Sequence, residues 1–489
     1  MFFHACFYRK KFSKNGKHTA TVTRGCCFDH STYFLQNPLD SFVGLGYTKY
    51  GTLYDFRKTS VKRGCFMIQR DFYLNQIKER MWDGNIKVIT GIRRGGKSTL
   101  LFSLFKEYLL STGVSENHII EIELDRRKYY KYRDPIVLCD YVADVIEADK
   151  ENKYYLFIDE VQLTKPTKDQ ESGIEVTIYD MLNELKAHPN LDCYVTGSNS
   201  RMLSSDIATE FRGRSSQIKV YPLSFAEFFS YRGGVVSEAL DEYMLYGGMP
   251  GLTQFHTAEQ KRAYLKNLYD EIYLKDLVEH GRIRREDILE EILDYLASQI
   301  GSLTNASKIA AFINTKVSAK IDEGLVARYV KQTMDAFLIS EAKRYDVKGK
   351  KYFDYPNKYY YSDVGLRNIR LNYRQIDPGH MMEHLIYCDL IRRGYSVDVG
   401  VVEEWQGNDR KTKEIDFIVN NTDRRIYIQS ALRMDEQAKA DTELASLKLT
   451  GDFFKKIVVR HDIPTSFYDE DGILHASLSD LLLDRVELF

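Results

Sequence analysis

The chain has 489 residues, of which 44% are hydrophobic and 28% are charged, and its formal net charge at pH 7 is -1. This length predicts about three domains, and the hydrophobic share excludes a largely disordered protein. The near-neutral charge excludes a globally basic nucleic-acid-binding protein, so any surface of that kind must be local.

The sequence also indicates the compartment in which the protein works. We find no run of about 18 apolar residues and therefore expect no membrane-spanning helix. The positive residues at 9–11 follow a short apolar run instead of preceding it, which is unlike a secretory signal peptide. The seven cysteines are irregularly spaced, which is typical of reduced thiols. These features predict a cytoplasmic protein.

Residues 1–66 differ from the rest of the chain because they have neither helical nor strand periodicity. Four of the seven cysteines lie here, at Cys6, Cys26, Cys27 and Cys65. None of these pairs has C-x-x-C spacing, which argues against a metal-binding module. Regular periodicity begins at Met67. We interpret residues 1–66 as an irregular extension, and an upstream start chosen in place of Met67 would explain it.

A phosphate-binding motif lies between a β-branched run at residues 88–90 and a helical pattern at residues 99–110. Residues 91–98 read GIRRGGKS and match G-x-x-x-x-G-K-[ST]; the strand, loop and helix context favours this motif over an ordinary glycine-rich turn. Such a loop points backbone amides at phosphate oxygens, and the helix N-terminus adds partial positive charge. The candidate nucleotide-binding residues are Gly91, Arg94, Gly95, Gly96, Lys97, Ser98 and Thr99.

An apolar run at residues 154–158 ends in Asp159 and Glu160. Alone, such a run usually marks a strand that enters a solvated turn. Downstream of a phosphate loop, it predicts a magnesium site and a catalytic base. Lys97 would reach the β- and γ-phosphates, while Ser98 and Asp159 would hold Mg²⁺. Glu160 would orient or deprotonate the attacking water.

Polar and basic residues follow the next apolar run, at residues 193–196. Ser198 and Asn199 would lie beside the phosphates, since ligands gather at the carboxyl edge of a parallel sheet. Arg212 and Arg214 follow, and an arginine that reaches the γ-phosphate stabilises charge in the transition state. Composition alone favours a solvated surface pair for these two arginines.

Several motifs together resemble the prokaryotic AAA-type ATP-binding proteins that carry a C-terminal region of unknown function. These motifs read GIRRGGKSTLL, LFIDEVQ, VTGSNSRML, FRGRSSQIKVYPLSFAEFF, YGGMP and YYSDVGLRN, and the resemblance extends from about residue 67 to the end. It implies that ATP is the nucleotide. It also implies that Ser198 or Asn199 senses the γ-phosphate and that Gly248 and Pro250 border the adenine. The two arginines would act in their own active site or in that of a neighbouring subunit.

Residues 236–300 predict a helical region, and residues 301–375 predict a region of helices and strands. Apolar residues recur at helical spacing through residues 236–300, which predicts a helical lid over the nucleotide. Five tyrosines of this segment are predicted to pack rather than bind ligand: Tyr243, Tyr246, Tyr264, Tyr269 and Tyr273. Residues 301–375 predict a winged-helix-like module, with helices at 307–313 and 322–337 before two strands.

Residues 341–361 contain six Lys or Arg and three acidic residues, a local charge of +3. The basic residues are Lys343, Arg344, Lys348, Lys350, Lys351 and Lys358, and the interleaved aromatic residues are Tyr345, Tyr352, Phe353, Tyr355 and Tyr359. This pattern suits DNA or RNA contact through phosphates and stacking. An amphipathic hairpin with one solvated face, or a module that binds protein, explains it equally well.

Residues 376–489 return to α/β character, with a helix at 381–393 followed by four strands. Glu383, Asp416 and Gln429 fall where a restriction-endonuclease-like fold keeps its acidic metal ligands. The third element should read Glu-x-Lys, but here it is Gln429-Ser430-Ala431. We therefore predict a degenerate nuclease-like domain that does not cut nucleic acid.

The sequence thus predicts an α/β protein with an AAA-type P-loop NTPase core at residues 67–235, followed by the lid, the winged-helix-like module and the nuclease-like domain. The predicted function is Mg²⁺-dependent ATP hydrolysis coupled to movement of the C-terminal domains. Two alternatives stay open: a nucleotide-gated signalling switch or scaffold with very slow turnover, and a DNA-processing factor that binds DNA through residues 300–489. A protein partner and an oligomer are compatible with either.

Overall fold

The computed structural model divides the chain into two units, residues 1–66 and 67–489. It describes residues 9–10, 20–21, 45–47, 53–55, 67–198, 215–281, 283–316, 320–353, 356–406, 409–434 and 437–489. In the first unit, β1 (Arg9–Lys10) pairs antiparallel with β2 (Ala20–Thr21), and β3 (Leu45–Tyr47) pairs antiparallel with β4 (Leu53–Asp55). Within these ranges, every helix is too short or too polar to cross a membrane.

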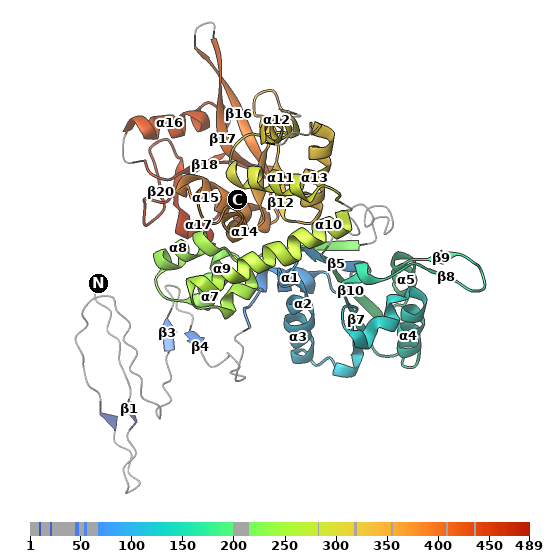
Figure 1. Ribbon diagram of the computed structural model, residues 1–489. Coiled ribbons are helices and arrows are strands. Elements are labelled where there is room, and N and C mark those ends of the chain that lie inside the picture. The colour runs from blue at the N-terminus through green and yellow to red at the C-terminus, as the bar shows by residue number, and fades with distance from the viewer. Residues whose placement is uncertain are drawn as a thin grey trace. The chain divides into compact units, whose positions relative to one another are not determined.

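A five-stranded parallel sheet forms the first half of the second unit (Figure 1). Its strands are β5 (Ile86–Gly91), β6 (Ile119–Glu123), β7 (Tyr154–Asp159), β10 (Leu191–Gly197) and β11 (Ser215–Val220), in the order β11-β5-β10-β7-β6. Every neighbouring pair is parallel. The phosphate loop follows β5, and the predicted Asp-Glu pair lies at the end of β7. The predicted α/β fold with a parallel P-loop sheet is therefore confirmed.

Helices cover both faces of this sheet, as a parallel sheet requires. One face packs against α1 (Asp71–Glu79) and the continuous helix formed by α2 (Lys97–Thr99), the π-helical η2 (Leu100–Phe105) and α3 (Lys106–Ser111). The other face packs against α4 (Pro135–Glu147) and α5 (Ile178–Leu185). Side chains of β7 alternate between the two cores: Tyr155 and Phe157 enter the first, Leu156 and Ile158 the second.

Short elements connect these layers. They are η3 (Glu116–His118), η4 (Arg127–Arg133), η5 (Val161–Leu163) and the antiparallel pair β8 (Thr167–Lys168) and β9 (Glu175–Val176).

A helical region follows the sheet. Its elements are α7 (Phe225–Arg232), α8 (Val236–Tyr246), η7 (Pro250–Gln254), α9 (Ala258–Asn267), η8 (Leu268–Leu274), α10 (Lys275–Gly281), α11 (Glu286–Ser298), α12 (Ala306–Lys316) and α13 (Glu323–Asp335). Four of the five tyrosines predicted to pack are buried in one core cluster, and Tyr264 packs against that cluster while half-buried. The packing prediction is therefore correct.

The C-terminal part contains an eight-stranded sheet of order β14-β13-β16-β17-β18-β19-β21-β20. Its strands are β13 (Arg344–Asp346), β14 (Lys351–Tyr352), β16 (Ser396–Gln406), β17 (Asp409–Asn421), β18 (Arg424–Ala431), β19 (Lys455–Arg460), β20 (Phe467–Tyr468) and β21 (Leu474–Ser477). The accompanying helices are α14 (Val364–Arg370), α15 (Pro378–Arg392), α16 (Gln437–Lys448) and α17 (Leu478–Leu482).

The strands of residues 339–361 contribute to two sheets. β12 (Ile339–Ala342) pairs antiparallel with β15 (Lys358–Tyr361), whereas β13 lies parallel to β16 and so extends the C-terminal sheet. One hydrophobic core also runs from Ile92 in the phosphate loop to Leu488 near the C-terminus. The helical region and the C-terminal sheet therefore share packing across the predicted boundary at residue 375, and that boundary remains a prediction.

Candidate nucleotide site

The phosphate loop has a backbone shape that requires glycine at two of its positions. Gly91 has φ 138°, and a Cβ there would lie 2.0 Å from the carbonyl oxygen of Val220 on the adjacent strand β11. Gly96 precedes α2 with φ 98°. Arg94 also has a positive φ, 63°, which is uncommon for a residue with a side chain. The loop is thus tightly curved, which is how such loops turn amides toward an anion.

Lys97 is buried at the start of α2 with its ammonium inside the loop. Its Nζ donates hydrogen bonds to the carbonyl oxygens of Gly91 at 3.0 Å and Ile92 at 3.1 Å. Burial lowers the pKa of Lys97, while the nearby charges of Glu160 and Asp159 oppose this shift. A buried cation with these neutral carbonyl partners suits the phosphate group of a nucleotide, because phosphate supplies the missing negative charge.

Ser98 and Asp159, the two predicted metal ligands, are in direct contact. The Ser98 hydroxyl lies 2.8 Å from Oδ2 and 3.0 Å from Oδ1 of Asp159, and the Thr196 hydroxyl also donates to Oδ1. Burial raises the pKa of Asp159, and these hydroxyl donors oppose the shift. Mg²⁺ prefers one or two protein oxygen ligands together with phosphate oxygens and water, so this pair fits it. Among the described residues, no group of three or more His, Cys, Asp or Glu could hold a metal ion.

Glu160 follows β7 in a left-handed conformation, with φ 55°. Its backbone N–H donates to the hydroxyl of Thr196 at 3.1 Å. Its side chain accepts a hydrogen bond of 3.1 Å from the Ser198 hydroxyl and another from the Gln162 amide. The structure thus brings Ser198, at the end of β10, to the predicted catalytic base. Asn199, Arg212 and Arg214 lie outside the described residues.

The predicted adenine-side residues lie close to the phosphate loop. A side-chain carbon of Pro250 is 3.7 Å from the position that a Cβ on Gly96 would occupy. The backbone N–H of Gly248 donates a 2.6 Å hydrogen bond to Asp363, a residue of the YYSDVGLRN motif. The loop that carries both predicted residues is therefore fixed on one side by the phosphate loop and on the other by α14.

Helices η8 and α10 also reach this site, through Tyr273 and Asp276 respectively. Arg93 of the phosphate loop forms an ion pair with Asp276, and the Tyr273 hydroxyl donates to the carbonyl oxygen of Arg93 at 2.9 Å. A cavity of about 50 Å³ lies alongside, lined by Gln162 from η5, by Ser198 just after β10 and by Gln332 from α13. Parts of the helical region thus contact the loop and the neighbourhood of the candidate base.

Sequence reasoning missed Arg70, whose side chain supports the phosphate loop through hydrogen bonds. Its guanidinium donates to the carbonyl oxygens of Gly95 at 3.1 Å and Tyr221 at 2.8 Å, and it pairs with Glu227 at 2.9 Å. Only 4% of Arg70 is exposed. An arginine just before a short amphipathic helix carries no local signal of these partners, which lie up to 157 positions away.

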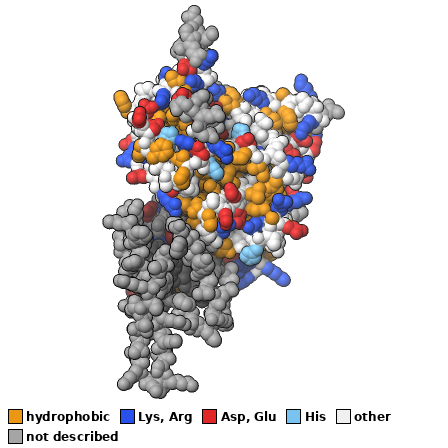
Figure 2. Space-filling model, turned by 90° about the vertical axis from the view of Figure 1, so that its left-hand side faces the viewer, with side chains coloured by type: hydrophobic (Ala, Val, Ile, Leu, Met, Phe, Trp, Pro, Cys, Tyr) orange, Lys and Arg blue, Asp and Glu red, His pale blue; other side chains and the backbone are white. Residues whose placement is uncertain are grey.

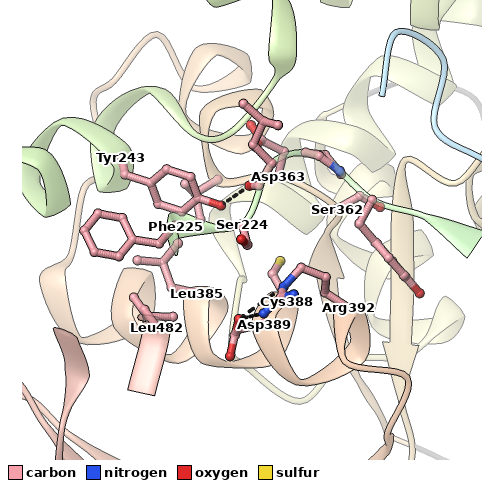
Figure 3. Close-up of a pocket in the computed structure, with 14 residues that line it drawn as sticks. Ser224, Phe225, Tyr243, Ser362, Asp363, Leu385, Cys388, Asp389, Arg392 and Leu482 are labelled. Atoms are coloured by element: carbon pink, nitrogen blue, oxygen red, sulfur yellow. Dashed lines mark hydrogen bonds and ion pairs between the residues drawn. The ribbon is translucent and has the colours of Figure 1, made fainter. Parts of the chain in front are cut away.

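Asp363 was likewise missed, although it belongs to a motif that supported the resemblance. Its carboxylate caps α14 by accepting from the backbone N–H of Gly365 at 2.9 Å and of Leu366 at 3.2 Å, in addition to Gly248. Burial raises its pKa to about 6 despite these three donors. It lines a cavity of about 30 Å³, with Tyr243 and Cys388 among its neighbours (Figure 3).

The structure corrects one part of the proposed basic surface. Lys358 is only 2% exposed and forms ion pairs, so it does not belong to a surface that could meet nucleic acid. Tyr359 is buried too, whereas Tyr352 is 55% exposed, and Tyr355 lies outside the described residues. The exposed basic residues are Lys343, Lys348, Lys350 and Lys351. On the face shown in Figure 2, acidic and basic side chains are interspersed rather than separated by sign.

The three residues predicted for the nuclease-like centre lie together. Lys358 Nζ is 2.8 Å from Glu383 and 3.7 Å from Asp416. The backbone N–H of Asp416 donates to the Gln429 side-chain oxygen at 3.3 Å. Burial, and secondarily the charge of Glu383, raises the pKa of Asp416. Sequence reasoning placed the acids correctly near one another but did not place Lys358 among them.

Comparisons with known proteins agree with the P-loop core. Residues 83–229 match the family described as AAA domain, and residues 237–377 match a domain of unknown function (DUF8612). A Haemophilus influenzae protein named only as uncharacterized is 31% identical over 429 residues, which cover 85% of this chain and 99% of that protein. An uncharacterized protein of Methanocaldococcus jannaschii is 26% identical over 389 residues, covering 76% of this chain and 79% of the other.

Parts of this chain are also similar to solved structures. The Walker-type ATPase of Pyrococcus abyssi is 16% identical with a TM-score of 0.44, and the match covers 62% of this chain and 96% of that one. The Cdc6p structure of Pyrobaculum aerophilum is 11% identical with a TM-score of 0.28, and the match covers 58% of this chain and 90% of that one.

Proposed function

Because the chain belongs to the same family as the Haemophilus influenzae protein and contains an AAA domain, we propose that it binds ATP and hydrolyses it with Mg²⁺ at the loop of residues 91–98. The observation that carries this proposal is the contact between the Ser98 hydroxyl and Asp159 beside the buried ammonium of Lys97. A cation for phosphate and two oxygen ligands for a metal thus meet at one end of the sheet.

Each residue has a defined task in this proposal. The amides of the loop and Lys97 bind the phosphates, while Ser98 and Asp159 hold Mg²⁺, which neutralises phosphate charge when bound. Glu160 orients the attacking water and accepts its proton. Following the resemblance, Asn199 senses the γ-phosphate, and Arg212 or Arg214 stabilises the transition state.

A nucleotide-gated switch with very slow turnover is the second candidate, and one observation favours it. The Glu160 carboxylate already accepts hydrogen bonds from Ser198 and Gln162. A base held by two protein donors is less available to water, so hydrolysis would wait until these contacts rearrange. Steady-state turnover measured with and without candidate partners separates the switch from the ATPase.

In this proposal, the regions that follow the P-loop core would change position when ATP is bound or hydrolysed. Residues 236–300 act as a lid, which the ion pair between Arg93 and Asp276 supports. Residues 301–375 form the winged-helix-like module, and residues 376–489 form a nuclease-like scaffold. The element order α15-β16-β17-β18-α16-β19, with carboxylates on α15 and β17, supports the nuclease-like assignment. The exposed lysines near β13 and β14 could contact the phosphates of DNA, which is the alternative partner.

The test measures ATP binding and hydrolysis by the full chain in Mg²⁺. Lys97→Ala should abolish nucleotide binding, whereas Lys150→Ala, a change at an exposed lysine, should not. Glu160→Gln should keep binding and slow hydrolysis by about 10² to 10⁴. The matched control is Glu171→Gln, in an exposed turn. Hydrolysis by Glu160→Gln at the wild-type rate would refute the role of Glu160, and a wild type that binds no ATP would refute the whole proposal.

A further inference from the structure

A buried lysine lies among three carboxylates where the C-terminal region meets strand β15. Lys358 Nζ is 2.8 Å from Glu383 on α15, 2.7 Å from Glu414 on β17 and 3.7 Å from Asp416 on the same strand. Glu414 and Asp416 are two residues apart, so their side chains point to the same face of β17. The three carboxylates thus converge on one ammonium group.

Further hydrogen bonds fix two of the carboxylates around this ammonium. The Tyr360 hydroxyl donates to Glu383 at 2.6 Å, and the backbone N–H of Ser430 donates to Asp416 Oδ2 at 2.8 Å. Lys358 itself is almost fully buried. A lysine is rarely buried unless it is paired. Lys358 donates a hydrogen bond to Glu383 and lies within ion-pair distance of Glu414 and Asp416. Its surroundings therefore hold Lys358 in place as a cation.

The position of Lys358 differs from that of a lysine that assists a metal. An assisting lysine lies beside the ion and polarises water, and on β18 the residue at that place is Ala431, which has no such group. Lys358 comes instead from β15 and lies between the acids, where the oxygen ligands of a divalent ion would converge. The carboxylates are present, but the space that they enclose is occupied.

We propose that Lys358 is the resident cation of this acidic centre, in the place of a divalent metal, and that a metal site appears when its charge is removed. This inference is independent of ATP hydrolysis. The ammonium is part of the chain and therefore needs no supply of metal ions. Its ion pairs join β15 to α15 and to β17. In wild type the centre binds neither Mg²⁺ nor Mn²⁺. With Lys358 in place, these carboxylates, like the other described acids, form no group that could hold a metal ion. Lys358→Met removes the counter-charge between them, so that their oxygens draw together around a hard cation.

The experiment titrates the full chain with Mn²⁺ without nucleotide, and follows free Mn²⁺ by electron paramagnetic resonance and the Tm by calorimetry. Lys358→Met should bind one Mn²⁺ more than wild type, and Mn²⁺ should raise its Tm. Lys343→Met, at an exposed lysine, should behave like wild type. The double variant Lys358→Met with Asp416→Asn should lose the added site.

Two outcomes would overturn the proposal. One is a wild-type chain that binds Mn²⁺ at a site abolished by Asp416→Asn, because the centre would then hold metal alongside Lys358. The other is a folded Lys358→Met variant with no added Mn²⁺ site.

The loss of the buried charge can also change the folding of the Lys358→Met variant. If Lys358→Met folds only when Mn²⁺ is present, the proposal is supported. If it does not fold at all, the double variant Lys358→Met with Glu414→Gln carries less repulsion, and its Mn²⁺ binding decides the question.

Discussion

The carboxylate of Asp363 accepts a hydrogen bond of 2.6 Å from the backbone N–H of Gly248, although 115 positions separate the two residues. This contact joins the N-terminus of α14 to the loop that carries Pro250, and Pro250 lies against the phosphate loop at Gly96. The buried carboxylate thus joins two distant parts of the region of unknown function, residues 237–377, and the part that carries Pro250 lies beside the phosphate loop.

The first prediction is that Asp363 makes stability depend on pH. Burial raises its pKa from 3.8 to about 6, so the folded chain holds this proton more tightly than the unfolded chain. The associated stability is present below about pH 4 and is lost as the pH rises to about 6; by pH 7 the loss is about 3 kcal/mol. Chemical unfolding measured from pH 4 to pH 7 tests this.

Asp363→Asn is the matched variant, because its side-chain oxygen can still accept from Gly248 but no longer titrates. The difference in free energy of unfolding between wild type and Asp363→Asn should change across this pH window. A difference that stays constant from pH 4 to pH 7 would show that Asp363 has the same pKa in the folded and unfolded chains.

Gly365 gives a second prediction, about the packing of α14 on α8. A Cβ at Gly365 would lie 1.9 Å from the carbonyl oxygen of Tyr246, a backbone atom that no rotamer change can move. We expect Gly365→Ala to destabilise the chain by about 3 kcal/mol or more. Gly324→Ala in α13 is the control, since the nearest atom to a Cβ there, at 3.0 Å, belongs to the Asp322 side chain and not to backbone, and since alanine favours helix. Equal Tm values for the two variants would contradict the proposed tight packing.

The third prediction concerns Arg70. Arg70→Ala leaves the carbonyl oxygens of Gly95 and Tyr221 without their donor and Glu227 without its cation. The phosphate loop should lose its fixed shape, and the Kd for ATP should rise about 10- to 100-fold, as expected for the loss of charged hydrogen bonds. Arg70→Lys should recover little, because an ammonium cannot span the three partners. Arg80→Ala, at the end of the same helix, should bind ATP like wild type.

The sequence predicted those parts of the site whose residues are close in the chain or lie at the carboxyl ends of strands in the same parallel sheet. The loop from Gly91 to Ser98 is one local segment. The carboxyl ends of β5 and β7 lie at the same edge of the parallel sheet, with β10 between them, and ligands gather at that edge, so the contact of Ser98 with Asp159 agrees with the predicted motif pair. Arg70, Asp363 and Lys358 act on partners far away in the chain. No periodicity encodes such pairs, and Lys358 therefore looked like one more member of a basic surface.

The last prediction is that the C-terminal region does not cut nucleic acid. Metal-dependent cleavage needs a bound divalent ion and, in this type of centre, a lysine near the attacking water. Gln429 is neutral and Ala431 has no ammonium group, so β18 supplies neither the charge nor the polarising group. Lys358 moreover lies between Glu383 and Asp416, where its ammonium repels a divalent ion. Linear DNA, supercoiled DNA and RNA should all stay intact with the full chain in Mg²⁺ or Mn²⁺. Asp416→Ala is the control, and cleavage by wild type that disappears in this variant would establish an active nuclease.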